Sequence, residues 1–230
     1  MYVGFLKFVA ICISAFLLIS WAFTQKSYSQ KLYPIQINEK WGYINEKGKI
    51  VIQPQFDEAE RFSEGLALVS IGLNDGFIDA KGKLIIEPIY RCSHGFSEGL
   101  AAVAKDCEGN WEYIDRNGKT VIEPKFSWAG QFRGGLAEVL FVTNEQPFDQ
   151  KTGYIDKSGK FIIEPKFDSS EPFSDGLAMI AEDKKREDGS SAYFNRKAFM
   201  DTKGNIVTPF FDRAEDFSDG LAAVEINNLW

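Results

Sequence analysis

Short apolar runs separated by polar turns fill the chain after residue 40. A first run combines glycine, an aromatic residue and isoleucine, as in residues 42–44, and a β-branched run follows a short polar break, as in residues 50–53. A third apolar run, such as residues 66–69, ends the pattern. Aromatic and β-branched residues favour strands. The pattern therefore predicts units of three short antiparallel strands joined as a meander.

This unit occurs five times. The distance from the first-strand aromatic residue to the glycine that opens the third strand, Tyr43 to Gly65 in the first unit, is the same in four units and one residue shorter in the fifth. The units lie at about 41–74, 75–110, 111–152, 153–197 and 198–230. Stacked repeats bury a continuous core that no single unit can form. We predict an all-β domain over residues 41–230, a tandem array of five three-stranded antiparallel meander repeats that stays an open curved array, with a closed propeller-like ring as the alternative.

The turns of the unit have a recurring chemistry. Aspartate or asparagine stands three residues before a glycine, as Asn45 stands before Gly48. Such a side chain can bond the backbone two residues on, and glycine adopts positive φ without strain, so a tight hairpin is predicted here. Acids precede the third-strand glycine at Glu64, Glu98, Asp175 and Asp219. We expect these acids to cap that turn, and we expect the small Ala67 and its equivalents where two sheets approach closely.

In these residues the chain resembles the WG-repeat family, also called KWG repeats. The residues that give the family its name are Lys40-Trp41-Gly42-Tyr43-Ile44. The fuller pattern, G-[YF]-I-[DN]-x-x-G-K-x-[VI]-I-x-P-x-F followed by F-S-[ED]-G-L-A-x-V, runs from residue 41 to residue 224. Glu112 departs from it by replacing a glycine, and Ala198-Phe199-Met200 replace Gly-Tyr-Ile in the fifth unit. The resemblance implies an all-β bacterial repeat module, often exported, and it carries over no catalytic residues.

Two further strand-like segments flank the repeats. Residues 32–37 (LYPIQI) precede the first unit within a linker and lead-in strand over 26–40, and residues 221–226 (LAAVEI) end the last unit. Pairing of these two segments would join the ends and protect both sheet edges. The growing length of the loops between units favours the open array instead.

The amino terminus has the pattern of an export signal. Residues 8–23 carry no charge, Lys7 precedes them and the polar segment 24–30 follows. This layout predicts a signal peptide over residues 1–25, or an N-terminal membrane anchor through residues 3–23 if it is not cleaved. The protein is therefore expected to be periplasmic, exposed on the cell surface or secreted, with membrane contact only through this segment.

Composition narrows the chemistry. The formal net charge of −7 argues against a nucleic-acid partner, because such proteins need a basic surface. A single histidine excludes a multi-histidine metal site, and there is no glycine-rich phosphate loop. We predict no cofactor and no metal. The excess of phenylalanine and glycine, 20 of each, belongs mostly to the repeated core and turns.

Two long loops between units are the predicted binding edge. Residues 141–152 and 182–198 occupy equivalent places in the repeat, so they are expected on one edge, where a repeat scaffold usually binds. The candidate binding residues are Trp128, Phe148, Lys184, Lys185, Arg186, Tyr193 and Phe194. The favoured function is an exported, non-enzymatic scaffold that binds a protein or a cell-envelope polymer. The alternatives are a carbohydrate-binding module, which requires exposed aromatic residues in a row, and a hydrolase with its site in these loops.

The connector of the second unit holds residue types that suggest other chemistry. His94 stands near Cys92, Ser93 and Ser97, the residue types of a nucleophile and its base. No other unit repeats them, so we interpret His94 as a half-buried connector residue and predict no catalytic residue. Cys92 and Cys107 could form a disulfide in an oxidising compartment.

Overall fold

The computed structural model describes residues 31–142, 150–185, 193–215, 217, 220–226 and 229. The predicted signal peptide or anchor lies outside the described residues, and so do Phe148, Arg186 and Asp219. Every regular element of the described part is a β-strand, so the predicted all-β class is confirmed. In this part, no helix meets the length and apolarity that a membrane span requires.

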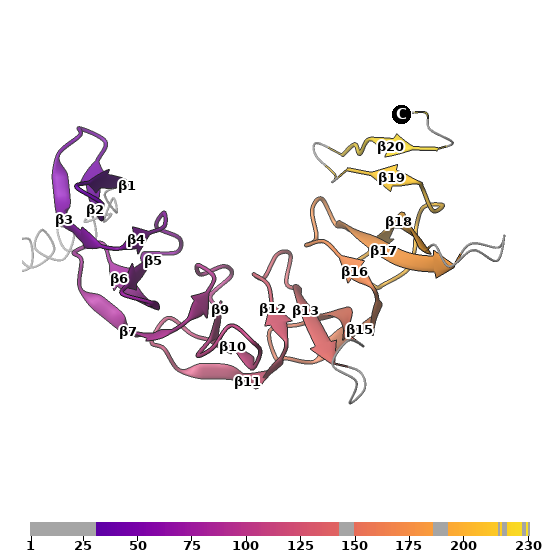
Figure 1. The fold of residues 1–230 in the computed structure, drawn as a ribbon, viewed down its shortest axis with the longest axis horizontal. Coiled ribbons are helices and arrows are strands. Elements are labelled where there is room, and N and C mark those ends of the chain that lie inside the picture. Colours follow the sequence, from indigo (N-terminus) through magenta and orange to yellow (C-terminus); the bar gives the residue numbers. More distant parts are fainter. Residues whose placement is uncertain are drawn as a thin grey trace, which may run out of the picture. The chain divides into compact units, whose positions relative to one another are not determined.

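The described strands form six small antiparallel sheets in sequence order (Figure 1). The first has β1 (Leu32–Ile37), β2 (Lys40–Asn45) and β3 (Ile50–Phe56). The second has β4 (Glu58–Ala59), β5 (Leu66–Ile71), β6 (Asn74–Asp79) and β7 (Leu84–Tyr90). The third has β8 (Cys92–Ser93), β9 (Ala101–Ala104), β10 (Trp111–Ile114) and β11 (Thr120–Phe126). The fourth has β12 (Trp128–Ala129), β13 (Ala137–Val142), β14 (Gln150–Ile155) and β15 (Phe161–Phe167). The fifth has β16 (Ser169–Ser170), β17 (Leu177–Lys185) and β18 (Tyr193–Asp201), and the sixth has β19 (Arg213–Ala214) and β20 (Val224–Glu225).

Three of the sheets contain a fourth strand that the sequence pattern did not predict. The connector after the proline contributes a strand of two residues, as in β4, where Glu58 pairs with Ser70. The N–H of Asp57 and the N–H of Glu60 extend this ladder to β5. Two residues are too few to show an alternation of apolar and polar side chains. The sequence of the connector therefore gives no sign of this strand, which is formed by backbone hydrogen bonds.

Each complete sheet combines strands from two sequence repeats. Strands β4 and β5 come from one repeat, and β6 and β7 come from the next. In the first sheet, β1 takes the place of the third strand, because Leu32 pairs with Asn45 as Leu66 pairs with Asp79. Among the described residues β1 pairs with β2 and β20 pairs with β19, so the pairing of segments 32–37 and 221–226 does not occur. The sheets are a tandem array and not a closed barrel.

The core lies between successive sheets. Tyr43, Ile52 and Phe56 of the first sheet form one buried cluster with Ala67 and Val69 of the second. Equivalent clusters follow at the next junctions. Ala67 is fully buried, which confirms that the small residue stands where two sheets meet. Large side chains of one sheet pack against alanine, valine and further large side chains of the next, so each sheet buries its apolar face only within the stack.

The first-strand hairpin has the predicted chemistry. The Asn45 side chain accepts hydrogen bonds from the N–H groups of Lys47 and Lys49, both at 3.0 Å. Gly48 has a φ of 73° and donates its N–H to the Asn45 carbonyl at 2.9 Å. All five units make this Asx turn with the same donors and acceptors. All partners of this turn lie within four residues, so each unit that carries the Asx and glycine positions can form it by itself.

The prediction that the acids before the third-strand glycine cap their own turn does not hold. Glu64 accepts a hydrogen bond from the N–H of Gly99 at 2.9 Å, and Gly99 lies in the next repeat. The neighbouring Ser63 hydroxyl donates to the Phe96 carbonyl at 2.7 Å, again in the next repeat. Arg116 adds an ion pair to Glu64 at 3.0 Å. These acids therefore connect consecutive repeats, and the expectation of turn capping was wrong.

Candidate functional site

The strands end at two opposite edges, which we name by their turns. The Asx-turn edge holds the hairpins between the first and second strands of each repeat, such as residues 45–49. The hairpin-tip edge holds the turns between the third strand and the next first strand, of which the structure describes residues 72–73 and 105–110. The corresponding residues 143–149 and 186–192 lie outside the described residues. The predicted binding loops belong to the hairpin-tip edge.

The segment 182–198 is a strand hairpin for most of its length, and not the loop that the sequence suggested. Strands β17 and β18 each have nine residues, with Lys184 paired to Phe194 and Lys185 paired to Tyr193. The described residues include the backbone of these four candidates but not their side chains. The segment 141–152 is likewise partly strand, because Val142 pairs with Gln150. Backbone pairing extends both hairpins into sequences with no apolar alternation.

Trp128 lies beside the start of the shorter of these two segments, because it pairs with Leu140 of β13. It begins β12, is partly buried and packs against the core cluster of the third and fourth sheets. Its ring lies against Gly130, where an added Cβ would be 2.9 Å from the indole. The sequence grouped Trp128 with the long loops, and the structure adds that its ring also meets His94 and shares a core cluster with Trp111.

A hollow of about 630 Å³ opens at the hairpin-tip edge between the second and third sheets. Its volume is within the range of small-ligand sites. On the side of the second sheet it is lined by Asp57, Glu58 and Asp75 and by the tip residues 72–73. On the other side it is lined by residues 91–94, Cys107, Trp111 and Trp128. We call this space the hollow.

The wall on the third sheet is aromatic. The His94 ring stacks on Trp111 with ring centroids 5.3 Å apart and 23° between the planes, and the edge of Trp128 meets His94 at 5.9 Å. Burial lowers the pKa of His94, which keeps the imidazole neutral at pH 7. The Ser93 Oγ, the His94 Nε2 and the Trp111 Nε1 are buried without a hydrogen-bond partner. Buried polar atoms are normally paired, so this wall holds unused hydrogen-bonding capacity.

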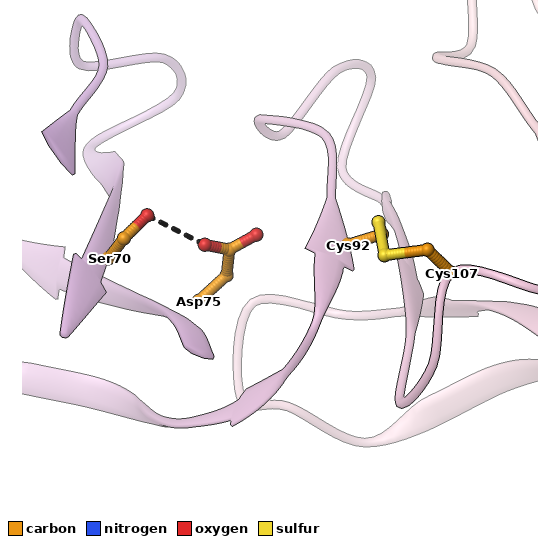
Figure 2. Close-up of a disulfide and its surroundings, with 4 residues drawn as sticks. All are labelled: Ser70, Asp75, Cys92 and Cys107. Atoms are coloured by element: carbon orange, nitrogen blue, oxygen red, sulfur yellow. Dashed lines mark hydrogen bonds between the residues drawn. A yellow bond between two sulfur atoms is a disulfide. The ribbon is translucent and has the colours of Figure 1, made fainter. Parts of the chain in front are cut away.

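The wall on the second sheet is acidic. Asp57 forms an ion pair with Lys40 and accepts the N–H of Gly72 at 2.7 Å, and these bonds hold its pKa below the ordinary value. The Ser70 hydroxyl donates to Asp75 at 2.7 Å, as Figure 2 shows. Partial burial raises the pKa of the adjacent Glu60, and the carboxylates of Asp75 and Glu58 raise it further. The acids on this wall therefore repel one another.

A disulfide joins Cys92 in β8 to Cys107 in the turn between β9 and β10 (Figure 2). The two Cα atoms are 5.4 Å apart, and both residues line the hollow. The bond connects the outermost strand of the third sheet to its hairpin tip. It therefore fixes the shape of one wall.

The residues around His94 do not form a nucleophile with its base. Cys92 is held in the disulfide, and the Ser97 hydroxyl donates to the Phe132 carbonyl at 2.7 Å. The Ser93 hydroxyl and His94 Nε2 each have no partner, so they do not bond each other. In the described part of the chain, no three His, Cys, Asp or Glu side chains are placed to hold a metal ion.

Five consecutive segments match the family model described as "WG containing repeat": residues 41–72, 76–111, 113–141, 153–185 and 198–230. The chain belongs to the WG-repeat family. This establishes the resemblance that the motifs indicated. A search of curated proteins found no match.

Solved structures resemble the WG-repeat array only in fold. A eukaryotic initiation factor aligns with a TM-score of 0.55 and 11% identity, over 87% of this chain and 58% of that chain. The WG-repeat chain thus spans less than two thirds of that protein. A protein of unknown function from Bacteroides caccae aligns with a TM-score of 0.34 and 14% identity, over 77% of this chain and 76% of that one. At these identities the first likeness concerns architecture alone.

At the hollow the WG-repeat pattern departs from itself. The two wall positions that Cys92 and His94 occupy are Glu58 and Glu60 in the first repeat and Ser169 and Glu171 in the fourth. Trp128 and Gly130 hold these positions in the third repeat. These differences set the hollow apart from the repeated core and turns. The signal lies in the comparison of equivalent positions between repeats, and no single residue carries it.

Proposed function

We propose that this WG-repeat protein is an exported, non-enzymatic scaffold that binds a protein or a cell-envelope polymer through its hairpin-tip edge. The observation that carries the proposal is the difference between the two edges. Every Asx turn has the same length and the same bonds. The hairpins at the other edge differ: their turns have two residues at 72–73 and six at 105–110, and strands β17 and β18 are extended to nine residues each. Recognition in repeat proteins is carried by the face that varies.

Two further observations support the export and the lack of catalysis. The apolar leader has the layout of an export signal, and a disulfide suits an oxidising compartment. Two of the residues that could have formed a nucleophile are otherwise engaged, Cys92 in the disulfide and Ser97 with a backbone carbonyl, and the Ser93 hydroxyl makes no bond to His94. A carbohydrate-binding module is less favoured, because His94 covers the face of Trp111 and Trp128 is partly buried.

The experiment is partner capture with the exported full chain, followed by mass spectrometry. A variant replaces residues 183–195 with Gly-Leu, the two-residue tip found at 72–73, which joins the paired residues Glu182 and Arg196. Loss of the captured partner in this variant is the expected result. The same set of partners from both proteins would overturn the assignment to this edge. Cell fractionation of the tagged full chain tests export separately, and retention in the cytoplasm would contradict it.

A further inference from the structure

The hollow combines features that point to a cationic ligand. Three carboxylates, those of Asp57, Glu58 and Asp75, line it against the single guanidinium of Arg91. Lys40 neutralises Asp57 through its ion pair. Glu58 and Asp75 are left without a cation among the described contacts, and both raise the energy of ionised Glu60. A positive group in the hollow would relieve this repulsion.

The aromatic wall argues for a peptide rather than a sugar. Sugar rings stack on the open face of an indole, but His94 already stacks on Trp111, whose exposed fraction is 4%. The same wall offers an unpartnered N–H at Trp111 and unpartnered polar atoms at Ser93 and His94. A peptide backbone carries both carbonyl and N–H groups, which are the complementary partners for these atoms.

The rim supplies apolar contact. Leu73 is 73% exposed at the two-residue tip beside the hollow, and Gly72 next to it is held by Asp57. The aliphatic stem of a long cationic side chain can pack along such a residue while its charged end reaches the carboxylates. Lysine and arginine have this shape. The disulfide holds the facing wall in shape.

We propose that the hollow between the second and third sheets binds a lysine or arginine side chain presented by a protein partner, with Glu58 and Asp75 as the charge-pairing residues. The inference rests on the proposed function and names what the hairpin-tip edge recognises. Among the proteins and envelope polymers of that proposal, the expected partner is a protein with an exposed basic segment. The net charge of −7 favours the approach of such a partner.

The test is a titration of the full chain with named probes. NMR spectra record the indole N–H resonances of Trp111 and Trp128 at each step. The probes are acetyl-Gly-Lys-Gly-amide, its arginine analogue, its norleucine analogue and cellotetraose. The lysine and arginine peptides are expected to shift both resonances, whereas norleucine, which keeps the stem and lacks the charge, is expected to leave them unchanged. Substitution of Trp111 or Trp128 by Phe assigns the signals.

Charge variants locate the contact. Glu58→Gln and Asp75→Asn are each expected to weaken the peptide by about tenfold. The matched control is Glu164→Gln in β15, which removes one charge from an exposed position outside the hollow and should leave the affinity unchanged. Equal weakening by all three variants would reveal a general effect of net charge and overturn the inference. Shifts caused by cellotetraose and not by the peptides would assign the hollow to a carbohydrate, and no shift with any probe would reject it as a site of this kind.

The outcome is separable from that of the proposed function. If the captured partner is lost when residues 183–195 are shortened but persists in the Glu58→Gln/Asp75→Asn double variant, the edge binds and the hollow inference fails. If the basic peptides bind the hollow and no partner is captured, the proposed scaffold function fails while the hollow inference stands.

Discussion

The two edges of the array are built from different kinds of residue. At the Asx-turn edge the same bonds recur from repeat to repeat, and Ser63 and Glu64 connect one repeat to the next. At the hairpin-tip edge the turns differ in length, and the hollow includes Cys92, His94 and Trp128, whose side chains differ from those at the equivalent positions of the other repeats. The difference teaches that repetition marks what holds the stack together. We assign recognition to the hollow, where residues that differ from their equivalents in the other repeats converge.

The connection along the Asx-turn edge has one gap. Arg133 and Gly134 of the third repeat replace the serine and the acid that connect the other repeats. This junction is instead bridged by Lys125, which donates to the Gly159 carbonyl at 3.2 Å, and by Ser170, which donates to Glu138 at 3.0 Å. The Asx-turn edge is therefore regular in its turns and variable at one junction.

The largest expected effect is at the Asx-turn edge. Gly159 has a φ of 80°, and an added Cβ would be 2.8 Å from Ile122 of the preceding repeat. Gly159→Ala is expected to lower the free energy of unfolding by about 3 to 4 kcal/mol, from backbone strain and overpacking together. Urea unfolding measures it. Gly72→Ala at the hairpin-tip edge is the matched control, since Gly72 has positive φ but an open surrounding, and about 1 kcal/mol is expected there. Equal losses at both glycines would contradict the contrast between the edges.

The second expected effect is at the hairpin-tip edge. The Cys92–Cys107 disulfide closes a short loop, with a sequence separation of 15. Removing it by Cys92→Ala and Cys107→Ala is expected to lower the free energy of unfolding by about 3 kcal/mol or somewhat less, mainly by freeing the unfolded chain. Urea unfolding with and without reductant checks this result. The parent protein in reductant should lose the same amount as the variant, and full stability of the reduced parent would refute the role of the bond.

The third expected effect tests a residue that occurs once but lies in the core. Glu138 is 9% exposed, and burial raises its pKa from 4.5 to about 7. Because the folded state favours the protonated carboxyl, the stability that Glu138 contributes is full below pH 4.5 and is lost as pH rises through 7. Glu138→Gln is therefore expected to gain about 2 kcal/mol over the parent at pH 8 and almost nothing at pH 4.5. Urea unfolding at both values measures the gain. Glu164→Gln on the exposed face of the same sheet should show no such difference, and a pH-independent effect of Glu138→Gln would exclude this explanation.

Local residues account for most of what the sequence predicted. The Asx turns, the strands around them and the small alanine at the sheet junction follow from patterns within a few residues, and the structure has them. The connector strands were missed because two residues show no alternation. The role of Glu64 was misread because its partner Gly99 lies 35 residues away in the next repeat, and a turn cap looks the same in sequence.

The candidate site was predicted in pieces. His94, Trp128 and the cysteine pair were each singled out, but nothing in their sequence spacing brings residues of the second and third repeats to one hollow with Asp57 and Asp75. Their convergence depends on how successive sheets stack, which is a tertiary property. The long loop at 182–198 was predicted as loop because its strand extension is formed by pairing with the facing strand and not by its own composition.

Hydrogen exchange of the full chain with its captured partner tests the central claim most directly. The two edges report separately, because each has its own backbone amides. The account predicts that binding slows exchange at the hairpin tips, including residues 72–73 and 105–110, and leaves the Asx turns at 46–49 and 157–160 unchanged. Protection confined to the Asx turns would contradict it.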